Sequence, residues 1–180
     1  MGHRRGSFTL WTCLILSAMA ISSPLCLGAS RASRDDKSSA AGSARSLEED
    51  RRIRANEMFL IGNSHYQKKE LNDAIQHYKI AINLNPDIIS YYLNLGNCLR
   101  EVSEYEESLR ILQKAVFLNE KHSKSWYNLG VTYHTMGLYN DAILSYNNAT
   151  LLTPDYINAH YNKGNLLTNL LTCFLSLSFS

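Results

Sequence analysis

The sequence predicts an all-α fold, a right-handed superhelical solenoid built from short helix hairpins. Three observations support this prediction. First, glycines recur in a register of 34 residues without an insertion, at Gly62, Gly96, Gly130 and Gly164. Second, the apolar residues around these glycines fall at i, i+3, i+4 and i+7, which is one face of an α-helix. Third, Pro86 and Pro154 stand at equivalent places in the register, where each would end a helix.

The composition is that of one ordinary packed unit. Of the 180 residues, 45% are hydrophobic and 19% are charged, which excludes a disordered polyampholyte and a many-pass membrane protein. The formal net charge is only +2, and two of the arginines lie in a leader that we expect to be removed. A nucleic-acid partner is therefore not expected.

The first element, residues 1–28, is predicted to be a secretory signal peptide. Arg4 and Arg5 belong to a short basic start, and an uncharged, largely apolar run follows over residues 8–21. Pro24 interrupts the apolar stretch, which favours cleavage near Gly28. The alternative is an uncleaved signal anchor, because residues 8–27 are just long enough to cross the hydrocarbon core of a bilayer. Both outcomes place the chain in the secretory pathway, either in the endoplasmic-reticulum lumen or secreted, or else anchored to the membrane.

The second element, residues 29–45, is predicted to be a disordered linker. It contains no large apolar side chain, so packing cannot offset the entropy of ordering it. Ordered chain is expected to begin at Ser46, which together with Glu49 has the S-x-x-E spacing of a capping box at a helix start.

The repeats follow, and each predicts two amphipathic helices joined by a tight turn. Small residues recur at the twentieth and twenty-seventh positions, where they let the two helices approach closely: Ala74, Ser108 and Ala142, then Ala81, Ala115 and Ala149. A large residue recurs at the twenty-fourth position: Tyr78, Leu112 and Tyr146. The fourth position holds Met58, Tyr92, Trp126 and His160, all of which are expected to lie in the core.

This pattern, W-x2-L-G followed by a small residue and a proline in a period of 34, resembles the tetratricopeptide repeat (TPR). The resemblance implies a helix extension and first repeat over 46–88, a second repeat over 89–122 and a third over 123–156. Residues 157–180 would form a partial fourth repeat with a hydrophobic tail. Because one hairpin cannot bury its own apolar face, neighbouring hairpins must stack into a solenoid.

The resemblance also implies that the first helix of each repeat lines a concave groove. Asparagine recurs there at the sixth and ninth positions, at Asn94, Asn128, Asn162, Asn63, Asn97 and Asn165, with Val131 as the exception. An asparagine offers one acceptor and two donors, so such a ladder can hold the backbone of an extended peptide. It is similar to the ladder in O-GlcNAc transferases. The alternative is that these amides serve only local helix contacts.

A second device of the family, the carboxylate clamp of chaperone-binding repeats, fits only in part. Asn63, Asn94 and Lys124 match it, but Phe59 replaces one cation and Asn128 replaces another. Binding of a chaperone's terminal carboxylates is thus not favoured, because two of three cations are missing.

No catalytic motif is present, so we expect a non-enzyme without a cofactor. The six histidines do not fall at metal-ligand spacing with cysteine or a carboxylate, so no metal site is predicted. Asn148 begins an N-x-[ST] glycosylation sequon that the secretory pathway would make usable.

The hydrophobic tail, from Leu166 to Ser180, has no charge and does not look like a solenoid cap. Truncation of a longer protein or association with a partner or a second copy would account for it, and it is too short to span a membrane. The predicted function is a scaffold that binds an extended peptide or a partner helix. The alternatives are the substrate-presenting part of a glycosyltransferase-type enzyme and a lumenal co-chaperone.

Overall fold

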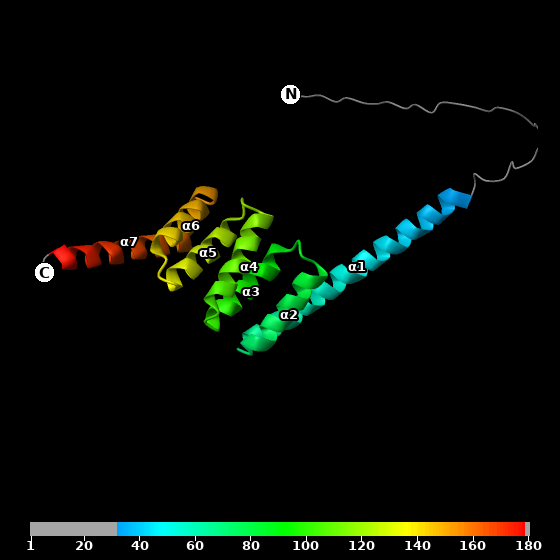
Figure 1. Cartoon of the computed structure of the whole chain (residues 1–180), viewed down its shortest axis with the longest axis horizontal. Helices are drawn as coiled ribbons and strands as arrows, with labels where there is room; N and C mark the ends of the chain where they lie inside the picture. Colours follow the sequence, from blue (N-terminus) through cyan, green and yellow to red (C-terminus); the bar gives the residue numbers. More distant parts are fainter. Residues whose placement is uncertain (1–31, 179–180) are drawn as a thin grey trace, which may run out of the picture. The chain divides into compact units, whose positions relative to one another are not determined.

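The computed structural model describes residues 32–178, and the side chains of residues 44–175. Every regular element in this part of the chain is an α-helix, as the all-α prediction requires (Figure 1). The helices are α1 (Ala32–Gln67), α2 (Leu71–Leu84), α3 (Ile89–Glu101), α4 (Tyr105–Leu118), α5 (Ser123–Thr135), α6 (Tyr139–Leu152) and α7 (Ile157–Ser178). The chain divides into two compact units, Met1–Ala40 and Ala41–Ser180, and the repeats lie in the second.

Within the second unit, the helices form three hairpins, α1–α2, α3–α4 and α5–α6, followed by α7. Each helix from α2 onward packs against the next one in the chain, and α3 also contacts α5. This is the arrangement of a solenoid, in which a repeat touches its neighbours and little else. The first helices α3, α5 and α7 begin at the residues that open each row of the register.

The glycine of each first helix lies where the second helix of the hairpin comes closest. A Cβ atom at Gly62 would lie 2.7 Å from the Tyr78 ring, and one at Gly96 would lie 2.7 Å from the Leu112 side chain. Gly130 has the same relation to Tyr146, at 2.8 Å. Because side-chain atoms cannot approach a Cβ so closely, only glycine permits this packing distance.

The small and large columns of the second helix are buried as predicted. The side chains at the twentieth, twenty-fourth and twenty-seventh positions are all 0% exposed, namely Ala74, Ser108, Ala142, Tyr78, Leu112, Tyr146, Ala81, Ala115 and Ala149. Ser108 also donates a hydrogen bond of 2.8 Å to the backbone carbonyl of Gly96. In each hairpin, therefore, one large side chain of the second helix packs against the glycine of the first helix, and the small residues on either side of it let the two helices approach.

The turn inside each hairpin is made by a residue in the left-handed region. Lys69, Ser103 and Gly137 occupy equivalent positions, with φ of 63°, 67° and 76°. The amide that follows each of them donates back to a carbonyl five residues earlier, for example from Glu70 to His65 at 3.0 Å. Of these three residues, only Gly137 indicates a turn in the sequence, because lysine and serine rarely adopt positive φ.

The turn between repeats is closed by the residue at the fourth position. Tyr92 donates to the Pro86 carbonyl at 2.8 Å, and the Trp126 indole donates to the Glu120 carbonyl at 2.7 Å. His160 forms the equivalent contact with Pro154 at 2.8 Å, but its side chain is exposed, so the expectation of a core histidine is wrong. No repeat packs over the outer side of α7 within the described residues, which leaves His160 open to solvent.

The expected helix start at Ser46 is also wrong, because α1 begins at Ala32 and Ser46 lies inside it. The part of the expected linker from residue 32 onward is therefore helical. Lack of large apolar side chains excludes burial, but a helix needs only its own backbone hydrogen bonds and residues of good propensity, such as alanine and arginine. The predicted leader, residues 1–28, lies outside the described residues.

Helix α7 continues to Ser178 instead of turning back as a second helix. Its Leu166 is 1% exposed against α6, whereas Leu171 and Phe174 are 59% and 70% exposed. Gly164 has no atom of a second helix within 4 Å of an added Cβ, unlike the other three glycines of the register. No helix in the described part of the chain combines the length and apolarity needed to cross a bilayer.

Two glycine-to-alanine substitutions test the role of the close approach. Gly96→Ala would place a methyl group 2.7 Å from Leu112, and we expect it to lower the free energy of unfolding by about 1–3 kcal/mol. Gly164→Ala meets open space, and we expect it to raise stability by up to about 1 kcal/mol through helix propensity. Urea denaturation followed by circular dichroism measures both values. Equal effects at the two positions would contradict the packing described here.

Candidate functional site

The asparagines singled out in the sequence lie on the first helices α1, α3, α5 and α7, and we call them the amide row. At its start, the Asn63 side-chain oxygen accepts two hydrogen bonds, from the Tyr78 hydroxyl and from the Asn94 amide, both at 2.8 Å. One asparagine thus ties its own second helix to the next repeat. The amides of the row therefore have a structural part in the stack.

Further along, other polar bonds join successive first helices. The Asn162 amide on α7 donates to the Tyr127 hydroxyl on α5 at 3.1 Å. The Tyr91 hydroxyl on α3 donates to the Asn56 side-chain oxygen on α1 at 2.6 Å. Sequence reasoning did not single out Asn56, Tyr91 or Tyr127, because no residue type runs through three repeats of their columns. These bonds confirm that first helices stack directly on one another.

The Asn63–Tyr78–Asn94 arrangement is not repeated, because two of its positions change residue type. In the second repeat Leu112 stands where Tyr78 stands in the first, and in the third repeat Val131 replaces the asparagine. Two polar atoms are left over. Among the described residues, Asn128 Nδ2 and the Tyr146 hydroxyl are the buried side-chain atoms without a hydrogen-bond partner.

Both of these groups are well removed from water. Asn128 is 5% exposed and Tyr146 is 0% exposed. Burial raises the pKa of Tyr146 to about 12; nearby Tyr127 adds to this rise, while the Asn162 amide, as a donor to the phenol oxygen, and Arg100 oppose it. The phenol therefore stays protonated at neutral pH and can donate a hydrogen bond. The O–H group itself has no acceptor. A buried donor without a partner costs about 1–3 kcal/mol, so an acceptor that reached either donor would be bound favourably.

The remaining predicted site residues are more open. Asn97 accepts a hydrogen bond from the Arg100 guanidinium at 3.1 Å, and both side chains are half-buried. Lys124 and Asn165 are exposed. The structure thus brings Asn63 and Asn94 together, and joins Asn97 to a cation that sequence reasoning missed. Arg100 is one helical turn from Asn97, a spacing that could have identified it.

The carboxylate clamp remains incomplete in three dimensions. Phe59 packs its ring against Tyr78 and Tyr91, with centroids 5.7 Å and 4.8 Å apart, so it belongs to the core. Asn128, at the place of the second missing cation, is buried. Of the clamp positions, only Lys124 presents a positive charge.

Asn148 lies within α6, and its side chain is half-buried beside the fully buried Ala149. The Thr150 hydroxyl of the sequon donates to the Asn147 carbonyl at 2.9 Å. The acceptor asparagine is thus part of a regular helix.

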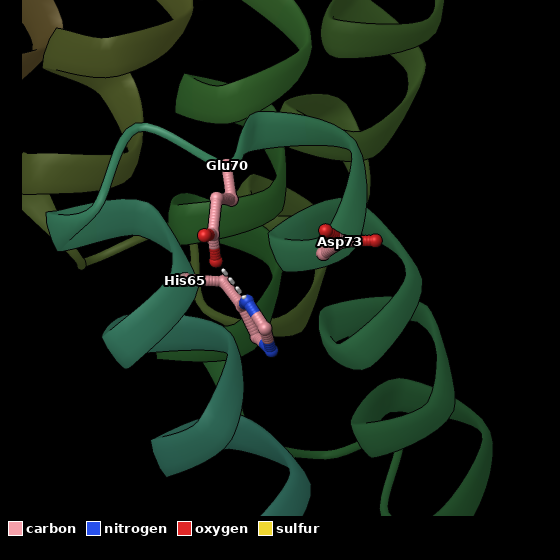
Figure 2. Close-up of side chains that lie close together, drawn as sticks. All are labelled: His65, Glu70 and Asp73. Carbon is pink, nitrogen blue, oxygen red and sulfur yellow. Dashed lines mark hydrogen bonds and ion pairs between the residues drawn. The ribbon is translucent and has the colours of Figure 1, made fainter.

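The sequence predicted no metal site, and one histidine nevertheless lies close to two carboxylates. His65, Glu70 and Asp73 each offer a ligand atom, and these atoms lie within 4.8 Å of one another (Figure 2). The residues come from the end of α1, the turn and the start of α2. Sequence spacing missed them because the left-handed Lys69 folds the chain back between them.

Comparisons with known proteins agree with this architecture. The family model described as "TPR repeat" matches residues 62–101 and 136–170. The chain is similar to the Hsp70-Hsp90 organizing protein 1 of Arabidopsis thaliana, with 39% identity over 56 residues, which is 31% of this chain and 10% of the relative. The Hsp70-Hsp90 organizing protein of Triticum aestivum matches at 40% identity over 55 residues. The match spans about a tenth of the length of these curated relatives.

Solved structures show the same fold at low sequence identity. The Arabidopsis OM64 TPR domain superposes with a TM-score of 0.64 at 24% identity, covering 66% of this chain and 98% of that domain. The first TPR of Spaghetti (RPAP3), bound to the HSP90 peptide SRMEEVD, gives a TM-score of 0.64 at 17% identity, covering 67% of this chain and 95% of that one.

Two tyrosine-to-phenylalanine substitutions at equivalent positions test the unpartnered hydroxyl. Tyr78→Phe removes a bonded hydroxyl, and we expect it to lower the free energy of unfolding by about 1 kcal/mol. Tyr146→Phe removes an unbonded one, so stability should stay unchanged or rise by up to about 1 kcal/mol. Urea denaturation measures both. A loss in Tyr146→Phe as large as in Tyr78→Phe would show that the Tyr146 hydroxyl is already satisfied.

Proposed function

We propose that this chain, a tetratricopeptide-repeat protein, acts as a scaffold that holds an extended segment of a partner polypeptide along its first helices α1, α3, α5 and α7. The observation that supports this most directly is the Asn128 side chain on α5, whose Nδ2 atom has no hydrogen-bond partner although the residue is only 5% exposed. An extended peptide offers unpaired backbone carbonyls at regular intervals, and a rotation of the Asn128 side chain would let its amide donate to one of them.

The charges near the amide row favour backbone recognition over recognition of terminal carboxylates. A similar TPR structure, that of Spaghetti (RPAP3), is bound to an HSP90 peptide ending in EEVD. In this chain Phe59 and Asn128 stand where a carboxylate clamp would place cations, and Lys124 alone gives a point charge without a bidentate fork. The ligand proposed here is therefore a peptide read mainly through its main chain.

The proposed setting is the secretory pathway, in the endoplasmic-reticulum lumen or outside the cell. The basic start and the apolar run of residues 8–21 support this proposal. Mass spectrometry of the mature amino terminus from a lumenal fraction tests it. A mature chain that still begins at Met1 and fractionates with cytosol would contradict it.

A substitution at Asn128 separates ligand binding from folding. Asn128→Leu keeps the number and branching of the side-chain heavy atoms and removes the unpartnered amide, which offsets the cost of the larger methyl groups, so the free energy of unfolding should change by less than about 1 kcal/mol. The affinity for a fluorescent peptide selected on the full chain from a random-sequence library should drop about 5- to 30-fold, the equivalent of one lost hydrogen bond. Fluorescence polarisation measures this.

The control is Asn83→Leu, the same change at an exposed position of the second helix α2. It should leave peptide affinity within about twofold. Equal losses in both variants, or no loss in Asn128→Leu, would place the peptide elsewhere.

The incomplete clamp makes a separate prediction. The peptide SRMEEVD and the same peptide with an amidated carboxyl end should bind with affinities within about threefold of each other, because a single exposed lysine contributes little to binding. Isothermal titration calorimetry compares them. Strong preference for the free carboxylate would mean that other cations complete a clamp.

A further inference from the structure

A second polar cluster lies at the turn between α1 and α2, apart from the residues assigned to the amide row. His65 Nδ1 is 2.6 Å from Glu70 Oε2, and Asp73 brings a carboxylate to within 4.8 Å of the other two ligand atoms (Figure 2). The ring of His77 stacks on the His65 ring, with centroids 5.0 Å apart and an interplanar angle of 21°. Two imidazoles and two carboxylates thus meet at one hairpin turn.

The other hairpins show that packing does not require these histidines. The positions equivalent to His65 are Leu99 and Tyr133, and those equivalent to His77 are Ile111 and Ser145. In the second hairpin the pair is Leu99 and Ile111, which is a purely apolar contact. The first hairpin has two imidazoles at the same two positions of the register. Helix packing does not account for these polar side chains, because apolar ones fill the same positions in the second hairpin.

The backbone holds the cluster in position. The Glu70 amide donates to the His65 carbonyl at 3.0 Å across the left-handed Lys69. His77 Nδ1 is 2.8 Å from the carbonyl oxygen of Asp73, so it donates to this oxygen and its other ring nitrogen stays available. The nearest cation along the chain, Lys69, forms an ion pair with Glu101 on α3 at 3.4 Å. Lys69 is therefore paired with Glu101 and not with the carboxylates of Glu70 and Asp73.

We propose that His65, Glu70 and Asp73 form a binding site for a divalent transition metal of the zinc class. One imidazole and two carboxylates suit such an ion, whereas magnesium and calcium prefer oxygen ligands alone. Two negative charges balance the charge of the ion. Three protein ligands leave a fourth position for water or for a side chain of a partner, as in open zinc sites.

The geometry needs adjustments of one half-buried side chain, His65, and of the exposed Glu70 and Asp73. Tetrahedral bonds of about 2.0–2.1 Å require ligand atoms about 3.3 Å apart. The contact of His65 with Glu70 must open from 2.6 Å, with the metal taking the place of the shared proton. The widest separation, up to 4.8 Å, must close by rotation of side chains at the surface. Neither change moves a helix.

The test is a calorimetric titration of the reduced full chain with zinc chloride. We expect one site that is lost, or weakened at least tenfold, in His65→Asn and in Glu70→Gln. The matched control is Glu104→Gln, because Glu104 occupies the equivalent turn position of the second repeat but follows Leu99 in place of a histidine. Its zinc affinity should stay within about twofold of the unsubstituted chain.

The same titrations, repeated with calcium chloride, distinguish this site from zinc held by cysteines and from a general cation site. Zinc held by cysteines would bind all variants alike and would overturn the proposal, as would calcium binding with equal affinity. Circular dichroism of each variant checks that its helix content is unchanged. If the unsubstituted chain takes up no zinc, His65 and Glu70 form only a hydrogen bond with each other, and the proposal is wrong.

Discussion

The structure depends on one constraint, the close approach of two helices at a glycine in each hairpin. Gly62, Gly96 and Gly130 leave just enough room for Tyr78, Leu112 and Tyr146, and the flanking alanines and serine of the second helix are fully buried as a result. This contact recurs in all three hairpins. Hairpins that share it can stack with their first helices side by side, which places the asparagines of those helices in a row.

Periodicity made most of the fold predictable, because each packing position recurs three or four times in the sequence. The turns were less visible, since Lys69 and Ser103 adopt the left-handed conformation that only Gly137 reveals. The start of α1 was missed because absence of apolar side chains says nothing about backbone hydrogen bonding. His160 was misplaced because a core column becomes surface where stacking ends in the described chain.

The site was predictable only in part, because its features arise where the repeats differ. Asn63 and Asn94 were recognised as members of two recurring columns, but the Asn63 oxygen accepts from both Tyr78 and Asn94, so the two amides take part in packing. Asn128 and Tyr146 lack partners because Leu112 and Val131 interrupt the same arrangement. Likewise, the cluster at His65 exists because the first repeat has imidazoles at positions that are apolar in the second. Departures from the repeat are thus the most informative positions for function.

The central claim is that a peptide satisfies the unpartnered Asn128 amide of the amide row. Its most direct test is the two-dimensional 15N spectrum of the side-chain amide groups, recorded with and without the library-selected peptide. Our account expects the Asn128 side-chain resonances to shift strongly and their exchange with solvent to slow, while those of Asn83 on α2 stay in place. Shifts confined to α2 and α4, with Asn128 unchanged, would contradict it.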